Sequence, residues 1–104
     1  MILRRRFADL IARQLDLFEA DNAALIADCA AAERAYDEAP RDEAEERYGD
    51  YLDLVETGTE ILADMRDHYV RASLDESAVV DYERAFNRAA AKRFRTFALE
   101  PEDT

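Results

Sequence analysis

Three side chains of one predicted helix, Glu60, Asp64 and His68, have the types and spacing that could bind a metal ion or share a proton. They recur every four residues and therefore lie on one face of a helix, and carboxylate and imidazole are both metal ligands. A ferritin-like dinuclear centre needs carboxylates from four helices and two Glu-x-x-His motifs, and this chain contains no such motif. A solvated His–Asp pair on a helix explains the same spacing. We therefore predict no metal and no cofactor, and keep these three residues as the candidates to inspect.

The chain lacks the residue pairs that nucleophilic catalysis requires. Cys29 and His68 are its only cysteine and histidine, and the helical pairing described below keeps them apart. Ser73 and Ser77 belong to the start of a predicted helix, and no glycine-rich loop is available to hold a phosphate. We predict that Cys29 is a small buried side chain, and that the protein is not an enzyme.

One acidic segment resembles part of a known enzyme family. The stretch Glu45–Leu52 is similar to the acidic helix of the all-α nucleotide pyrophosphohydrolases, in which Glu-x-x-Glu and Glu-x-x-Asp pairs on adjacent helices hold magnesium against a triphosphate. Glu43 and Glu46 match the first spacing, and Asp64 with Asp67 approximates the second. Both pairs lie on one predicted helix, so they cannot converge within a protomer. The resemblance implies an alternative function, a magnesium-dependent pyrophosphohydrolase with a site formed between protomers.

Two apolar rows predict the helices that position these residues. In each row the steps alternate between four and three residues, the spacing that keeps one side of an α-helix against a partner helix. Folding the chain back at Pro40 places Asn22 opposite Gly58. We interpret this pair as a register lock, in which one polar residue interrupts the seam and a glycine lets the backbones approach. A small polar cavity that binds a ligand or water is the alternative. The rows are Ile11, Leu15, Phe18, Asn22, Leu25, Cys29, Ala32 and Tyr36, and Ala44, Tyr48, Tyr51, Val55, Gly58, Leu62, Met65 and Tyr69.

Length and composition predict one all-α domain over residues 1–99. The 104 residues include only two glycines and two prolines, so few positions interrupt a helix. We predict helices over residues 3–37, 42–72 and 75–98. They form an antiparallel long helical hairpin with a shorter third helix, a three-helix bundle, and an acidic tail follows over residues 100–104.

The third predicted helix is too short to cover the whole hairpin. Running parallel to the first helix, it reaches only to about Asp28, and apolar side chains at the hairpin tip stay in water. Uncovered apolar rows from two protomers can meet across a two-fold axis, so we predict a homodimer. The predicted interface residues are Tyr36, Tyr48, Tyr51, Leu52 and Leu54.

A net charge of −11 restricts the classes of partner. Nucleic acid and anionic membrane both require a positive field, and no segment approaches the roughly 20 apolar residues that span a bilayer. Arg4, Arg5 and Arg6 precede an amphipathic stretch instead of an apolar signal core. We expect neither nucleic acid nor membrane as a partner, and a cytoplasmic location.

Two rows of charge offer surfaces for a partner of opposite charge. Solvated helix faces give the same pattern, whereas the functional alternatives are complementary charge between protomers, an anion on the basic row, or a protein partner with a basic surface. The function that we predict is a non-enzymatic protein-interaction or scaffold module. The acidic row is Glu46, Asp50, Asp53, Glu60, Asp64 and Asp67 on the second helix, and the basic row is Arg84, Arg88, Lys92 and Arg95 on the third.

Overall fold

Four α-helices and two short 3-10 helices make up the part of the chain that the structure describes. The structure is a computed structural model and describes residues 2–97 and residue 99, with side chains from Phe7 onward. No strand occurs in these residues, which confirms the all-α class, and the predicted acidic tail over residues 100–104 lies outside them. The helices are α1 (Ile2–Asp21), α2 (Ala23–Asp37), η1 (Arg41–Glu43), α3 (Ala44–Ser73), α4 (Glu76–Arg93) and η2 (Arg95–Phe97).

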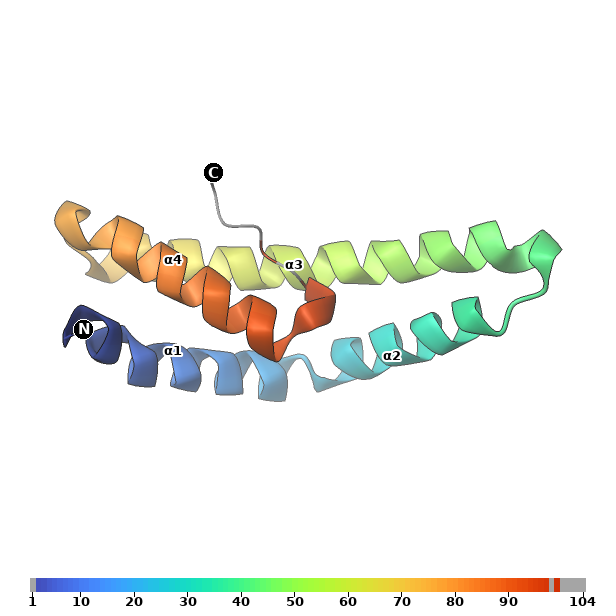
Figure 1. Ribbon diagram of the computed structural model, residues 1–104, viewed down its shortest axis with the longest axis horizontal. Helices are drawn as coiled ribbons and strands as arrows, with labels where there is room; N and C mark the ends of the chain where they lie inside the picture. Colours follow the sequence, from blue (N-terminus) through green and yellow to red (C-terminus); the bar gives the residue numbers. More distant parts are fainter. Residues whose placement is uncertain (1, 98, 100–104) are drawn as a thin grey trace.

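Helices α2 and α3 are antiparallel neighbours, and the turn between them forms one end of an elongated molecule (Figure 1). Its principal extents are 51 × 29 × 23 Å. The chain reverses at Pro40, as predicted, because the extended backbone there, with φ −63° and ψ 157°, cannot continue a helix. The Glu43 N–H then bonds to the Pro40 carbonyl at 2.9 Å and starts the next helix.

The single helix predicted over residues 3–37 is wrong, because the chain is interrupted at Asn22. This residue has φ −121° and ψ 30° and separates α1 from α2. Its side-chain Nδ2 donates to the Phe18 carbonyl at 3.0 Å, the same carbonyl that accepts its backbone N–H. Such local bonds from an Asn side chain compete with the regular helical ladder. The interruption lets α1 diverge from α3, and α1 packs against α4 instead (Figure 1).

Aromatic side chains of α4 join it to both neighbours. The Tyr82 ring lies 5.5 Å from the Phe7 ring of α1 and 4.9 Å from the Tyr69 ring of α3, measured between centroids. Burying a large apolar side chain stabilises the fold by about 1.5–3 kcal/mol, so this half of the molecule contains the main core. The side chains with no exposed surface are Phe18, Leu62, Tyr82, Phe86 and Ala90.

Polar groups inside this core have partners within the described residues. The Tyr82 hydroxyl donates to Gln14 Oε1 at 2.9 Å, and Arg66 Nη1 donates to Asn87 Oδ1 at 2.9 Å. An unsatisfied buried polar group costs about 1–3 kcal/mol. These two bonds therefore fix the register of α4 against α1 and α3.

The third predicted helix, over residues 75–98, is too long, because α4 ends at Arg93. Phe94 has φ −123° and ψ 74°, and η2 turns the chain toward α3. The Phe94 and Phe97 rings both meet Phe18 edge to face, with centroids 5.1 and 5.9 Å away. These two aromatic contacts with the buried Phe18 ring stabilise the turn more than one further helical turn would, because that turn would add only backbone hydrogen bonds.

Candidate interaction surface

Four apolar side chains remain together at the α2–α3 end of the molecule, and we call them the tip surface: Tyr36, Tyr48, Tyr51 and Leu52. The exposed fractions of Tyr36, Tyr48 and Leu52 are 38, 44 and 38%, and Tyr51 is half-buried. The Tyr36 and Tyr48 rings are 5.1 Å apart, and the Tyr48 and Tyr51 rings 6.5 Å. Leu54, the fifth predicted interface residue, is half-buried against the core. The structure thus brings four of the five predicted residues together.

The tip surface is exposed because α4 and η2 cover only part of α3. Successive contacts along α4 and η2 join Tyr82 to Tyr69 and then Phe97 to Gly58. Thr96 of η2 makes the last contact with α3, a side-chain hydrogen bond with Tyr51. Burial raises the pKa of the Tyr51 hydroxyl, nearby Glu33 adds to the rise, and the bond with Thr96 opposes it. Beyond Tyr51, the part of the chain that the structure describes forms a layer of two helices only, α2 and α3.

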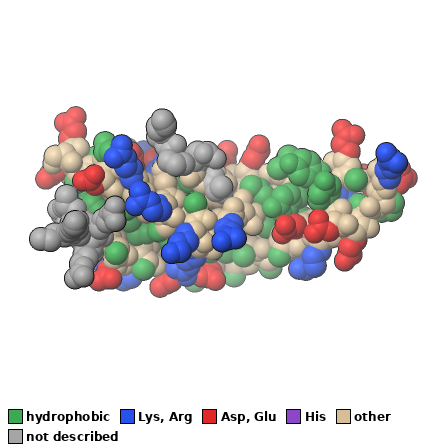
Figure 2. Space-filling model, viewed as in Figure 1, with side chains coloured by type: hydrophobic (Ala, Val, Ile, Leu, Met, Phe, Trp, Pro, Cys, Tyr) green, Lys and Arg blue, Asp and Glu red, His purple; other side chains and the backbone are tan. Residues whose placement is uncertain are grey.

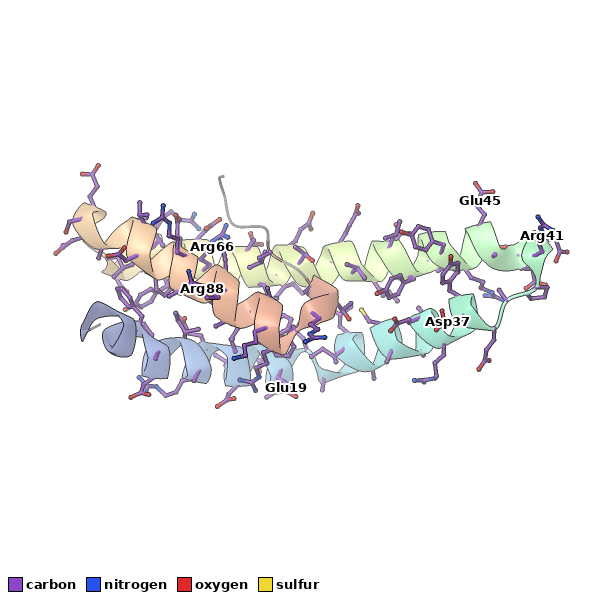
Figure 3. The ribbon with its side chains drawn as sticks, in the orientation of Figure 1. Glu19, Asp37, Arg41, Glu45, Arg66 and Arg88 are labelled. Carbon is purple, nitrogen blue, oxygen red and sulfur yellow. The ribbon has the colours of Figure 1, made fainter. Side chains whose placement is uncertain are left out.

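Negative charge surrounds the tip surface. Between Glu33 and Asp53, nine carboxylates outnumber three arginines, and all twelve side chains are exposed. Figure 3 shows Glu45 and Arg41 pointing away from the hairpin at its turn. The Glu43–Arg47 ion pair, at 3.6 Å, is exposed on both sides and neutralises little of this charge. The tip is therefore aromatic at its centre and acidic at its margin.

The basic row lies on the other half of the molecule, along α4 and η2. Arg84, Arg88, Lys92 and Arg95 are all exposed, and none forms an ion pair with another residue in the described part of the chain. The segment from Arg84 to Arg95 carries five cations and no carboxylate. Figure 2 shows Lys and Arg side chains over α4 and apolar side chains over the α2–α3 half, on the same face of the molecule.

The fifth cation of this segment, Arg93, serves a different purpose. Its Nη2 lies 2.6 Å from Glu19 Oε1 and 2.7 Å from Asp16 Oδ1. Hydrogen bonds to Glu19 and then to Asp16 raise the pKa of the Arg93 guanidinium. Arg93 therefore ties α4 to α1 and is not available to a partner.

The predicted register pair of Asn22 and Gly58 has a different structural basis. The nearest atoms to a Cβ built on Gly58 all belong to the Phe97 ring, so this glycine makes room for Phe97. The Asn22 side-chain amide donates to the Phe18 carbonyl of α1. The two residues act separately, one by admitting an aromatic ring and the other by interrupting a helix.

The three metal candidates, Glu60, Asp64 and His68, are exposed on α3. Over residues 2–97 and 99, no group of three or more His, Cys, Asp or Glu side chains is placed to hold a metal ion. The structure does not gather these candidates into a site.

The carboxylate pairs that resemble those of the pyrophosphohydrolases are also far apart. Glu43 ends η1 and Glu46 lies in the first turn of α3, whereas Asp64 and Asp67 lie near the other end of α3. A separation of about 18 helical residues is roughly 27 Å. The two pairs do not meet within this chain.

A cleft of about 220 Å³ opens beside the tip surface, where η2 meets α2. Cys29 lines it with an exposed fraction of 4%, and burial, with the charge of Asp28, raises the pKa of the thiol. A protonated thiol is a poor nucleophile. The other lining residues are Ile26, Ala30, Glu33, Arg93, Phe94, Arg95, Thr96 and Phe97.

Sequence reasoning missed the two polar contacts that hold α4 in place, Gln14–Tyr82 and Asn87–Arg66. A signal exists for Gln14, which lies three residues after Ile11 and four before Phe18 and thus borders the buried face. A polar residue in that position needs a partner. The identity of the partner depends on how α4 packs, which no spacing within α1 reveals.

Comparison of the chain with models of known protein families, with curated proteins and with solved structures finds no match. The helices of the described residues are all too short or too polar to cross a membrane.

Proposed function

We propose that this protein is a non-enzymatic helical interaction module that forms a homodimer through its tip surface. The observation that carries the proposal is the exposure of Tyr36, Tyr48 and Leu52. The Tyr36 and Tyr48 rings are in contact, and Leu52 lies one helical turn after Tyr48 on α3. Exposed aromatic residues that gather on one surface are typical of protein interfaces, where Tyr is enriched.

The energetics of the hairpin support this role. A helix acquires most of its stability by packing an apolar face against other elements, and the tip halves of α2 and α3 have only one another. Burying part of the tip surface adds about 25 cal/mol for each Å² of apolar area removed from water. A partner therefore supplies the missing layer and stabilises this half of the molecule.

The proposal is tested by placing one uncharged polar side chain on the tip surface. In Leu52→Gln the new amide would have to be buried in the interface without an apolar contact, so the dimer weakens and sedimentation gives a mass closer to that of the monomer. Leu17→Gln is the matched control, because Leu17 is also an exposed leucine, at 55%, but lies on α1. A Leu52→Gln protein that remains as dimeric as Leu17→Gln would contradict the proposal.

A further inference from the structure

We infer that the two copies pack antiparallel, with the tip surface of each copy on the basic row of α4 in the other. This inference rests on the proposed homodimer and specifies its geometry. The alternative arrangement, in which the two tip surfaces face each other, is the one that charge disfavours.

Charge distinguishes the two arrangements. A tip-to-tip contact sets nine carboxylates and three arginines against an identical set, and like charges that face each other in an interface suppress association. The segment Arg84–Arg95 has the opposite sign, because it carries no carboxylate and four of its five cations, all except Arg93, form no ion pair in the described residues. The surface whose charge best complements the acidic tip is therefore the basic row on a second copy of the chain.

The side chains of the α4 row also suit an aromatic partner. Val80 lies four residues before Arg84, on the same side of α4, and has an exposed fraction of 54%. It offers an apolar contact, and arginine side chains favour the faces of tyrosine rings. Tyr36 and Tyr48 supply such rings with 38 and 44% of their surface free.

The shape of the molecule allows both contacts to form at once. Figure 2 shows Lys and Arg side chains over α4 and a group of apolar side chains over the α2–α3 half on one face of the molecule. In Figure 1, α4 lies over one half of the long axis and the α2–α3 tip extends over the other. Two copies related by a two-fold axis near η2 place the α4 half of each over the uncovered tip of the other. Each copy uses the same two surfaces, so the contact closes into a dimer and leaves no site for a third copy.

A charge-swap experiment tests this arrangement. The row-reversed variant carries Arg84→Glu, Arg88→Glu and Lys92→Glu, and the tip-reversed variant carries Glu33→Lys, Glu45→Lys and Glu56→Lys. All six side chains are exposed, and each of the three glutamates lies three or four residues from Tyr36, Tyr48 or Leu52. The row-reversed variant alone sets like charges together, and the tip-reversed variant alone sets three new lysines against the basic row, so we expect the dimer dissociation constant of each to rise at least about tenfold. Mixing the two variants restores both contacts and yields a heterodimer.

The outcomes separate this inference from the proposed function. A row-reversed protein that dimerises as well as the wild type indicates a tip-to-tip contact and overturns the inference, but leaves the homodimer intact. A mixture that stays monomeric also overturns it. A wild-type protein that is monomeric contradicts the proposed homodimer as well. The neutral variant with Arg84→Gln, Arg88→Gln and Lys92→Gln provides a second test, because its dimer must be weaker than the wild type but stronger than that of the row-reversed variant.

Discussion

The ring of Phe97 occupies the space beside Gly58, and a Cβ on this glycine would lie 2.6 Å from the Cδ1 and Cζ atoms of the ring. Phe97 is 2% exposed and also contacts Phe18 of α1. The two contacts of the Phe97 ring therefore join η2 to both α3 and α1. Gly58 also lies close to the tip surface, because η2 makes its last contact with α3 at Tyr51, about two helical turns before Gly58.

Gly58→Ala should destabilise the protein, because the new methyl group must displace a buried ring. Overpacking costs about 1–3 kcal/mol, whereas the gain in helix propensity is about 1 kcal/mol. We expect a net loss of about 1 kcal/mol in the free energy of unfolding, measured by urea denaturation. Gly49→Ala is the control, since nothing lies within 4 Å of a Cβ built there. It should gain stability, and a Gly58→Ala protein that gains as much would show that Phe97 is not held at Gly58.

Tyr82 should make the protein sensitive to alkaline pH. Burial raises the pKa of Tyr82 to about 12, despite the hydrogen bond to Gln14 that opposes the rise. The unfolded chain ionises near pH 10 and the folded protein only near pH 12, so this contribution to stability is complete below pH 10 and is lost between the two values. The loss is about 2–3 kcal/mol.

Tyr82→Phe provides the comparison. At neutral pH this variant should be less stable by about 1 kcal/mol, because Gln14 loses its donor. As the pH rises from 10 to 12, thermal melting should show a smaller fall in stability for the variant than for the wild type. Parallel curves would show that Tyr82 is accessible to water in the folded state.

Arg93→Gln should weaken the contact between α1 and α4. The variant loses both ion pairs, to Glu19 and to Asp16, but the two carboxylates are 55 and 68% exposed. Exposed pairs contribute little, so we expect a loss of about 0.5–1 kcal/mol that shrinks as salt is added. Arg13→Gln is the control, because Arg13 is exposed on α1, forms no ion pair in the described residues and belongs neither to the tip surface nor to the basic row. If both variants unfold at the same denaturant concentration, Arg93 does not join the two helices.

The sequence predicted the α2–α3 hairpin because two apolar rows of equal period, separated by Pro40, admit few other pairings. The interruption at Asn22 was not predicted, because one asparagine by itself destabilises a helix only a little. The packing of α4 against α1 determines that the helix ends there, and this packing cannot be read from the sequence of α1. The turn at Phe94 escaped for a similar reason, since neither glycine nor proline precedes it. It depends on the space at Gly58, a contact between residues far apart in the sequence.

The tip surface was easier to foresee than these interruptions. The rise per residue of a helix is fixed, so the lengths of the predicted helices alone indicated how far the third could reach. In the structure, α4 and η2 contact α3 at Tyr69, Gly58 and Tyr51. Tyr51 lies at the edge of the tip surface. The sequence could not supply the exposed fraction of each side chain. Leu52 and Leu54 are two positions apart on α3, yet Leu52 is exposed and Leu54 is half-buried.

The mass of the wild-type protein in solution tests the central claim most directly. Sedimentation equilibrium at micromolar concentration and low salt should give twice the chain mass of 11.9 kDa. The mass should decline toward that of one chain as salt is raised, because opposite charges that face each other across the interface are screened. A mass of 11.9 kDa at every concentration and salt would contradict the proposal that the tip surface holds a second copy.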